Sequence, residues 1–205
     1  MELRAALSYC PIVAILRGVK PDEIEGVGDA LIEAGVTVVE VPLNSPQPFE
    51  SIRRLAARHG HHALVGAGTV LEAADVARVK EAGGQLVVAP NFDPDVVRAA
   101  RAANLASLPG VMTPSEGFAA LKAGADGLKL FPAEIIPPLV FKAWRAVFPA
   151  NCLMLAVGGV GVDNIKAYAD AGASGYGIGS ALYKPGRPAA EIGPLARALV
   201  AAAKA

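Results

Sequence analysis

A single lysine, Lys129, stands among apolar residues in the segment 127–132, GLKLFP. Because taking an ammonium group out of water is costly, burial shifts a lysine toward its neutral amine. A neutral amine can attack a carbonyl carbon and form a Schiff base. Lowering the pKa from about 10.4 to near 7 corresponds to about 4 kcal/mol. The alternative is a lysine at a strand end whose flexible stem carries the charge into solvent.

A second charged residue, Glu40, interrupts the apolar segment 36–41, VTVVEV. Schiff-base chemistry needs proton transfers at the carbinolamine, and cleavage of a carbon–carbon bond needs a base for the substrate hydroxyl. One partly desolvated carboxylate can serve each step in turn. The alternative is an ion pair with Arg17 or Lys129 that only neutralises their charge.

Two residues at the ends of other apolar segments have side chains suited to holding a carboxylate. Arg17 follows the segment 11–16 and offers a planar fork that fits such a group. Thr69 ends the segment 63–69, and its hydroxyl can donate a hydrogen bond. The alternatives for Arg17 are a contact with phosphate or a solvated strand end.

Glycines and a serine follow the last two apolar segments of the chain: Gly158, Gly159, Gly179 and Ser180. Glycines let backbone N–H groups approach an anion, and a serine hydroxyl adds a donor. We therefore expect these residues to bind a phosphate group, the alternative being glycines that only permit tight turns. The spacing in the segment 175–179, GYGIG, does not match a dinucleotide-binding fingerprint.

The chain contains eight recurring apolar segments, and the residues above lie at or near the ends of six of them. These segments are continuous rather than alternating, which is typical of parallel strands buried on both faces. The predicted strands are 11–16, 36–41, 63–69, 85–89, 105–110, 126–130, 152–157 and 174–178.

Helical segments separate the predicted strands, and a short leading helix over residues 1–9 precedes them. Ala-Gly pairs before several strands mark helix C-termini, and the run Asn44-Ser45-Pro46 predicts the cap of the helix that ends near Gly60. Eight such units predict an α/β protein with one domain, 1–205, folded as a (β/α)8 TIM barrel. The structural alternative is a doubly wound open sheet, which usually has fewer strands. A barrel places its active site at the C-terminal ends of its strands, so we expect the polar residues to meet at one mouth.

Composition argues against several classes of function. The formal net charge is zero and there is no basic run, so nucleic-acid binding has little electrostatic support. No apolar run reaches membrane-spanning length, and the N-terminus lacks the layout of a signal peptide. Cys10 and Cys152 show no paired spacing, which favours a cytoplasmic protein without disulfides.

The three histidines, His59, His61 and His62, are predicted to lie at the N-terminal face of the barrel, away from the mouth. We expect them to form a solvated loop near a helix C-terminus. Because the mouth has one clear carboxylate and no histidine, we expect no metal-dependent chemistry. An iminium can itself accept electrons, so no organic cofactor is expected.

Seven motifs together resemble the 2-keto-3-deoxy-6-phosphogluconate and 6-phosphogalactonate aldolases over nearly the whole chain. They are ILRG (15–18), VEVPLNS (39–45), GAGTV (66–70), PN (90–91), LKLFP (128–132), AVGGV (156–160) and GS (179–180). The resemblance implies a class I aldolase, usually a homotrimer, with a Schiff-base lysine at Lys129 and an acid/base at Glu40. It implies that Arg17 and Thr69 contact the substrate and that Pro90 and Phe131 line a pyruvate pocket. It assigns the phosphate to the glycines and serine named above.

Two positions differ from the phosphogluconate pattern within this family. Asn44 stands where that branch carries an arginine, and Val157 stands where it carries a threonine before the double glycine. Both differences resemble the phosphogalactonate branch, whose substrate has the other configuration at C4. Exchanging a hydroxyl for a methyl at position 157 would change discrimination at C4 by about 1–3 kcal/mol.

The expected reaction is therefore cleavage of 2-dehydro-3-deoxy-6-phosphogalactonate to pyruvate and glyceraldehyde 3-phosphate. The nearest alternative is the C4 epimer, 2-dehydro-3-deoxy-6-phosphogluconate, or both substrates. A sugar-phosphate epimerase or isomerase would keep the phosphate loops and a carboxylate but would not need a buried lysine. A sugar-phosphate sensor would bind the ligand without turnover.

Overall fold

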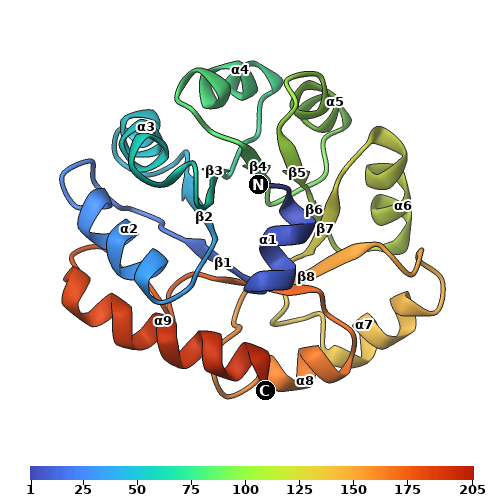
Figure 1. The fold of residues 1–205 in the computed structure, drawn as a ribbon. Helices are drawn as coiled ribbons and strands as arrows, with labels where there is room; N and C mark the ends of the chain where they lie inside the picture. Colours follow the sequence, from blue (N-terminus) through green and yellow to red (C-terminus); the bar gives the residue numbers. More distant parts are fainter.

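Nine parallel strands form one sheet that curves into a barrel surrounded by helices (Figure 1). The structure is a computed structural model that describes residues 1–205. The strand order is β5-β4-β3-β2-β1-β9-β8-β7-β6. The strands are β1 (Ile12–Ile15), β2 (Val38–Pro42), β3 (Leu64–Gly68), β4 (Leu86–Val88), β5 (Ala106–Leu108), β6 (Gly110–Val111), β7 (Gly127–Leu130), β8 (Leu153–Val157) and β9 (Gly175–Ile178).

The fifth predicted strand is divided at Pro109 into β5 and β6. Proline has no N–H group to donate to a neighbouring strand, so it interrupts a ladder. β5 pairs with β4, and β6 pairs with β7. The carbonyl of Pro109 accepts a hydrogen bond of 2.9 Å from Lys129 N and so links the division to β7. The predicted (β/α)8 barrel is confirmed, with one strand in two pieces.

A helix precedes the barrel and others follow its strands: α1 (Leu3–Tyr9), α2 (Ile24–Glu33), α3 (Pro48–His59), α4 (Ala73–Glu81), α5 (Pro94–Ala102), α6 (Pro114–Ala123), α7 (Pro138–Arg145), α8 (Ile165–Asp170) and α9 (Ala189–Lys204). Proline occupies the first turn of α3, α5, α6 and α7, where its missing N–H costs nothing. The helix α6 begins with a capping box, in which the side chains of Thr113 and Glu116 each accept a hydrogen bond from the other residue's backbone N–H.

The predicted cap of α3 is wrong. The helix begins at Pro48, and its N-cap residue Gln47 has a left-handed φ of 43° and no capping hydrogen bond from its side chain. Asn44 and Ser45 instead bond to the loop after β1: Asn44 to the Arg17 side chain and Ser45 to the Gly18 N–H. Asn44 and Ser45, residue types that often cap helices, therefore link the loop after β2 to the loop after β1.

Alternation along the strands creates two separate apolar cores. Side chains that point into the barrel form a cluster of 13 buried residues, which includes Val13, Ile15, Val38 and Leu155. The helix α1 contributes Leu3, Ala6 and Leu7 to this inner cluster and lies across the end of the barrel opposite the strand C-termini (Figure 1). The sequence of α1 thus closes one end and leaves the other as the mouth.

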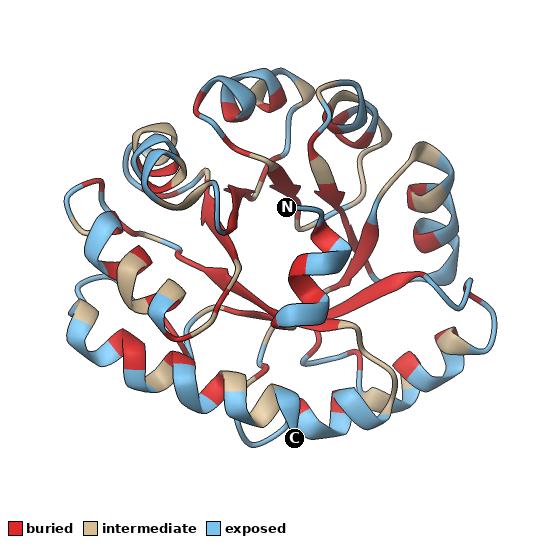
Figure 2. Cartoon of the chain, viewed as in Figure 1, coloured by how far each residue is buried: buried red, intermediate tan, exposed pale blue.

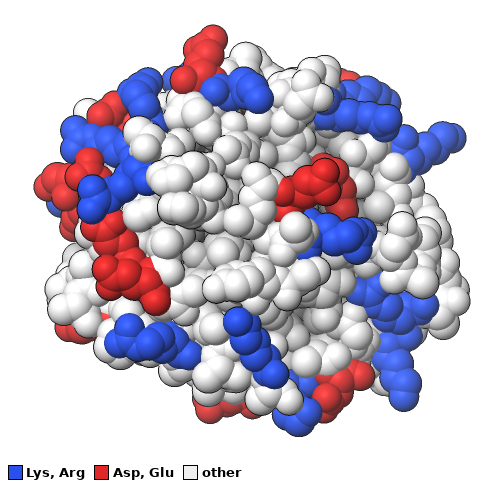
Figure 3. Space-filling view, in the orientation of Figure 1, with Lys and Arg blue, Asp and Glu red and all other residues white.

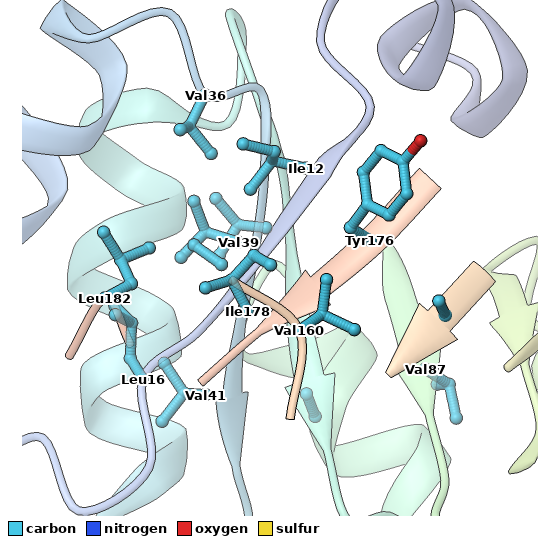
Figure 4. Close-up of a cluster of buried hydrophobic side chains, with 14 of the residues drawn as sticks. Ile12, Leu16, Val36, Val39, Val41, Val87, Val160, Tyr176, Ile178 and Leu182 are labelled. Atoms are coloured by element: carbon cyan, nitrogen blue, oxygen red, sulfur yellow. The ribbon is translucent and has the colours of Figure 1, made fainter. Parts of the chain in front are cut away.

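Side chains that point outward from the strands pack under the helices. This outer cluster holds 46 buried residues. Ile12, Val39 and Ile178 come from three neighbouring strands and lie together in Figure 4. Figure 2 shows buried residues along the strands and on the inner faces of the helices, while the outer helix faces are exposed. None of the helices combines the length and apolar character needed to cross a membrane.

The face that carries α1 displays charged side chains of both signs. Figure 3 shows Lys and Arg side chains next to Asp and Glu side chains, both at the edge of this face and nearer its centre. His59 ends α3 and lies 2.8 Å from Asp29 in α2, which also accepts two hydrogen bonds from Arg58. The rings of His61 and His62 lie against each other in the following turn. The chain contains no group of three or more His, Cys, Asp or Glu side chains arranged to hold a metal ion.

Candidate active site

Glu40 and Lys129 lie on the inward faces of β2 and β7. Their strand neighbours Val39, Leu128 and Leu130 point outward into the larger core. Glu40 is 2% exposed and Lys129 is 6% exposed. Both line the same small apolar void inside the barrel, together with residues such as Val13 and Leu155. The alternation of the two strands therefore places an amine and a carboxyl group in one small void with a mainly apolar lining.

Burial moves both groups toward their neutral forms. It raises the pKa of Glu40 to about 7, although the positive charges of Lys129 and Arg17 oppose the change. It is also the main cause that lowers the pKa of Lys129; Glu40 opposes this shift and Arg17 adds to it. The Oε2 atom of Glu40 is buried without a hydrogen-bond partner. Lys129 Nζ lies 4.7 Å from the centre of the Phe131 ring, which provides the amine with an apolar surface.

Gly68 makes room for the Glu40 carboxyl group. A Cβ atom at this position would overlap the Glu40 carboxyl oxygens. The residue ends β3, which runs beside β2 with Pro42 opposite Gly68. Only glycine lets the carboxyl group lie so close to the neighbouring strand.

Arg17, Asn44 and Thr69 form a polar cluster at the ends of β1, β2 and β3. Arg17 donates a hydrogen bond of 2.7 Å to Asn44 Oδ1 and another of 3.4 Å to Thr69 Oγ1. Thr69 adopts a left-handed φ of 54°, which is uncommon for a residue other than glycine. The guanidinium group is exposed, so part of its fork remains available to an anion.

A cavity of about 450 Å³ opens at the mouth of the barrel. Eight predicted site residues line it: Arg17, Lys129, Phe131, Val157, Gly158, Gly159, Gly179 and Ser180. Gly158 and Gly159 have φ values of 105° and 63°, a conformation that favours glycine. Such a turn exposes successive backbone N–H groups that can bind an anion. The arrangement thus has a buried amine at its base and a candidate anion site at its outer end.

The chain is similar to proteins of known family over nearly its whole length. A sequence model of a family described as "KDPG and KHG aldolase" matches residues 3–192. The chain belongs to the KDPG and KHG aldolase family. It is accordingly an aldolase, a lyase that acts on carbon–carbon bonds.

Two relatives and a solved structure show how close the likeness is. The chain is 48% identical over 192 residues to a "Probable 2-dehydro-3-deoxy-6-phosphogalactonate aldolase" of Rhizobium meliloti (strain 1021), covering 94% of this chain and 91% of the relative. It is 43% identical to the "2-dehydro-3-deoxy-6-phosphogalactonate aldolase" of Escherichia coli (strain K12), with 94% of each chain covered. A solved structure described as "Native KDPGal structure" is 42% identical, with a TM-score of 0.93 over 95% of this chain and 94% of that one.

Three predicted site residues of this aldolase do not line the mouth cavity directly. Glu40 lies beneath it in the barrel void, where it shares Lys129 and Val157 with the cavity wall. Thr69 joins the cavity through its bond to Arg17. Pro90 lies at the end of β4 beside Gly110, whose Cβ would overlap its carbonyl group. The backbone of Pro90 therefore fits against the divided strand, and its predicted contact with pyruvate stays a prediction.

Sequence reasoning missed two charged residues of the mouth cavity, Glu134 and Lys184. They lie in the loops after β7 and β9, four or more residues beyond the strand ends. Loops have no periodic pattern that indicates which way a side chain points. One feature of the sequence could have indicated them: Glu134 lies in the same loop as Phe131, and Lys184 lies in the same loop as Ser180.

The aldolase has a larger cavity of about 700 Å³ at the opposite end of the barrel. It lies beside α1 and is lined by residues such as Arg4, Gln85, Arg101 and Asp126. It contains none of the predicted site residues. Size alone therefore does not identify the cavity that reaches the buried amine of Lys129.

Proposed function

We propose that the chain is a class I aldolase that cleaves 2-dehydro-3-deoxy-6-phosphogalactonate to pyruvate and glyceraldehyde 3-phosphate. The observation that carries this proposal is the joint burial of Lys129 and Glu40 at the base of the mouth cavity. The names of the two relatives support the choice of substrate. The pathway served would be the breakdown of galactonate.

In the proposed reaction, the neutral amine of Lys129 attacks C2 of the keto acid and forms a carbinolamine. Loss of water, with proton transfer by Glu40, gives an iminium that draws electrons from the C3–C4 bond. Glu40 then takes the proton of the C4 hydroxyl as that bond breaks and glyceraldehyde 3-phosphate leaves. The remaining enamine takes a proton at C3, and water releases pyruvate from Lys129. A pKa of about 7 suits Glu40 to this alternation between acid and base.

The proposed substrate fits the distribution of polar groups around the cavity. Arg17 and Thr69 hold the carboxylate, while Gly158, Gly159, Gly179 and Ser180 hold the phosphate. Phe131 and Pro90 surround the pyruvate part. Val157 points into the barrel and is 6% exposed, so it offers the C4 region an apolar contact.

Borohydride reduction in the presence of pyruvate tests the proposed chemistry. We expect a stable adduct on Lys129, identified by mass spectrometry of its peptide. Lys129→Met should give no adduct and should stop cleavage while the protein remains folded. An epimerase, an isomerase or a sensor would form no such adduct.

Cleavage rates on the two C4 epimers test the proposed substrate. We expect the phosphogalactonate epimer to have the higher kcat/KM. Val157→Thr should shift the ratio toward the phosphogluconate epimer by about 10-fold, because a hydroxyl replaces a methyl group there. Equal rates in the natural protein would instead favour dual specificity.

We further propose that the aldolase is a homotrimer in the cytoplasm. Both cysteines are buried free thiols, which suits a reducing compartment. Exposed apolar side chains on and near α7, including Leu139, Ile135 and Val147, offer a surface for contact between copies. The molar mass from light scattering tests the trimer.

A further inference from the structure

Two charged side chains of the mouth cavity have no part in the proposed reaction. Glu134 follows β7, and Lys184 follows β9. Both are exposed, and neither forms an ion pair or a side-chain hydrogen bond. They share the cavity wall with the double glycine and Ser180. This is the part of the cavity to which the proposed function assigns the phosphate.

Glu134 lies directly over the double glycine. A Cβ at Gly158 would overlap its carboxyl oxygen, and a Cβ at Gly159 would lie 2.7 Å from its Cγ. The neighbouring residue Ala133 holds this loop in place, because its N–H donates to Val157 O at 2.8 Å. Its carbonyl also accepts a hydrogen bond of 2.8 Å from the buried Tyr168 hydroxyl. These two hydrogen bonds of Ala133 therefore hold the backbone next to Glu134 in place.

The carboxylate of Glu134 thus lies where a phosphate would approach the exposed N–H groups of the glycine turn. Two anions cannot share that place without repulsion, so one must move. The Glu134 side chain is exposed and can rotate about its own bonds, whereas the glycine turn consists of backbone that directly follows β8. A phosphate that binds there would have to displace the Glu134 side chain, and this displacement would lower the affinity of the protein for the phosphate.

Lys184 is the one cation of the cavity wall that neither takes part in the proposed reaction nor forms a side-chain hydrogen bond. Of the three cations in the cavity wall, Lys129 is the proposed nucleophile and Arg17 bonds to Asn44 and Thr69. An ammonium group on a flexible stem can follow a phosphate as a point charge. The glycine turn supplies N–H donors without a full charge, so Lys184 would add the missing positive charge.

We propose that Lys184 and Glu134 act in opposite directions on the affinity for the phosphate end of the substrate. Lys184 contacts the phosphate and strengthens binding. Glu134 competes with the phosphate for the glycine turn and weakens binding. This inference rests on the proposed function, because it takes the phosphate to bind beside Gly158 and Gly159.

The test compares the full-length variants Lys184→Gln and Glu134→Gln with the natural protein. For the phosphorylated sugar acid, we expect Lys184→Gln to raise KM about 5- to 10-fold and Glu134→Gln to lower it about 2- to 5-fold. The effect of Lys184→Gln should shrink as salt is added, because added ions screen an exposed charge pair. Lys80→Gln and Glu81→Gln, which are exposed on α4, are matched controls and should match the natural protein.

Trapping of pyruvate by borohydride separates this inference from the proposed function. Pyruvate carries no phosphate, so both variants should trap it at rates within about twofold of the natural protein, as expected for exposed residues away from the reacting atoms. Calorimetric titration with glycerol 3-phosphate measures the phosphate contact without turnover, and its affinity should change in the same directions as KM. An unchanged affinity in Lys184→Gln, or a weakened one in Glu134→Gln, would overturn the inference even if the natural protein traps pyruvate. Failure of the natural protein to trap pyruvate would instead overturn the proposed function.

Discussion

Glu40 and Lys129 influence each other because they share one buried void at the base of the mouth. Each is buried, and each favours the charged form of the other. Burial is the larger effect for both, so the carboxyl group keeps its proton and the amine loses one more readily than in water. Burial thus disfavours a fixed ion pair between the two groups, and a pKa of about 7 lets the Glu40 carboxyl group gain and lose a proton near neutral pH.

The raised pKa of Glu40 predicts how stability depends on pH. The folded-state value of about 7 lies above the ordinary value of 4.5. The folded protein thus holds the proton more tightly, and the resulting stability is present below pH 4.5 and lost as pH rises through 7. The loss amounts to about 3 kcal/mol. Glu40→Gln removes this titration, so we expect its free energy of unfolding to fall less between pH 5 and 8.

Urea unfolding at several pH values measures this difference. Glu81→Gln, an exposed control, should give a curve parallel to that of the natural protein. Parallel curves for Glu40→Gln as well would show that Glu40 titrates normally. The same variant should lower kcat by a factor of about 100 or more, because the proton shuttle is lost.

Gly68→Ala tests the space that Glu40 needs. The added Cβ would overlap the carboxyl oxygens, so the carboxyl group must move. We expect kcat to fall at least about 10-fold, because a displacement near 1 Å disturbs the reacting geometry. Gly26→Ala is the control, since a Cβ there meets only ordinary contact with Ala189. It should retain full activity and gain about 0.5–1 kcal/mol of stability in α2.

The loop between β2 and α3 stabilises the loop after β1 through two hydrogen bonds. Asn44 accepts from Arg17, and Ser45 accepts from Gly18 N–H at 2.9 Å. A sequence pattern could not reveal this, because the partners lie 27 residues earlier. Locally, the same residues match a helix cap, which explains why the predicted start of α3 was wrong.

Asn44→Ala should leave the Arg17 fork less well oriented. We expect KM for the sugar acid to rise about 5-fold, the typical effect of one lost hydrogen bond, while kcat changes less than twofold. Asn44→Asp keeps an acceptor at the same place and should restore most of the affinity. Equal KM values for Asn44→Ala and the natural protein would mean that Arg17 is oriented without this bond.

At the scale of the whole molecule, the helix that closes the barrel and the proposed active site lie at opposite ends of the barrel axis. The helix α1 covers the N-terminal end, and the polar residues occupy the other. Leu7 is 3% exposed in the inner core. Leu7→Ala should cost about 3 kcal/mol of unfolding free energy and leave kcat unchanged at temperatures where the protein is folded.

Leu71→Ala provides the comparison for that measurement. Its side chain is 49% exposed, so we expect a change in stability within about 0.5 kcal/mol. A large loss of kcat in folded Leu7→Ala would show that α1 affects the mouth after all.

The barrel could be predicted from the sequence because every strand is buried on both faces and appears as a continuous apolar run. A run that is apolar on both faces does not show which way Glu40 and Lys129 point; only their place near the C-terminal ends of their strands followed from the barrel. The division at Pro109 depends on how β4 and β7 pair with the strand between them. A local sequence pattern does not contain that information. Glu134 and Lys184 were missed for a related reason: loop conformation decides where they point.

Pro109 has a consequence for the distance between the amine and the carboxyl group. Going one way around the barrel from β2 to β7, the ladder passes without a break through β1, β9 and β8. Going the other way, it reaches β7 through β5 and β6, where the Pro109 carbonyl accepts a hydrogen bond from Lys129 N itself. The backbone of Lys129 is therefore bonded on both sides, to Pro109 and within the pairing with β8, so its height along the barrel relative to Glu40 is set by backbone hydrogen bonds in both directions.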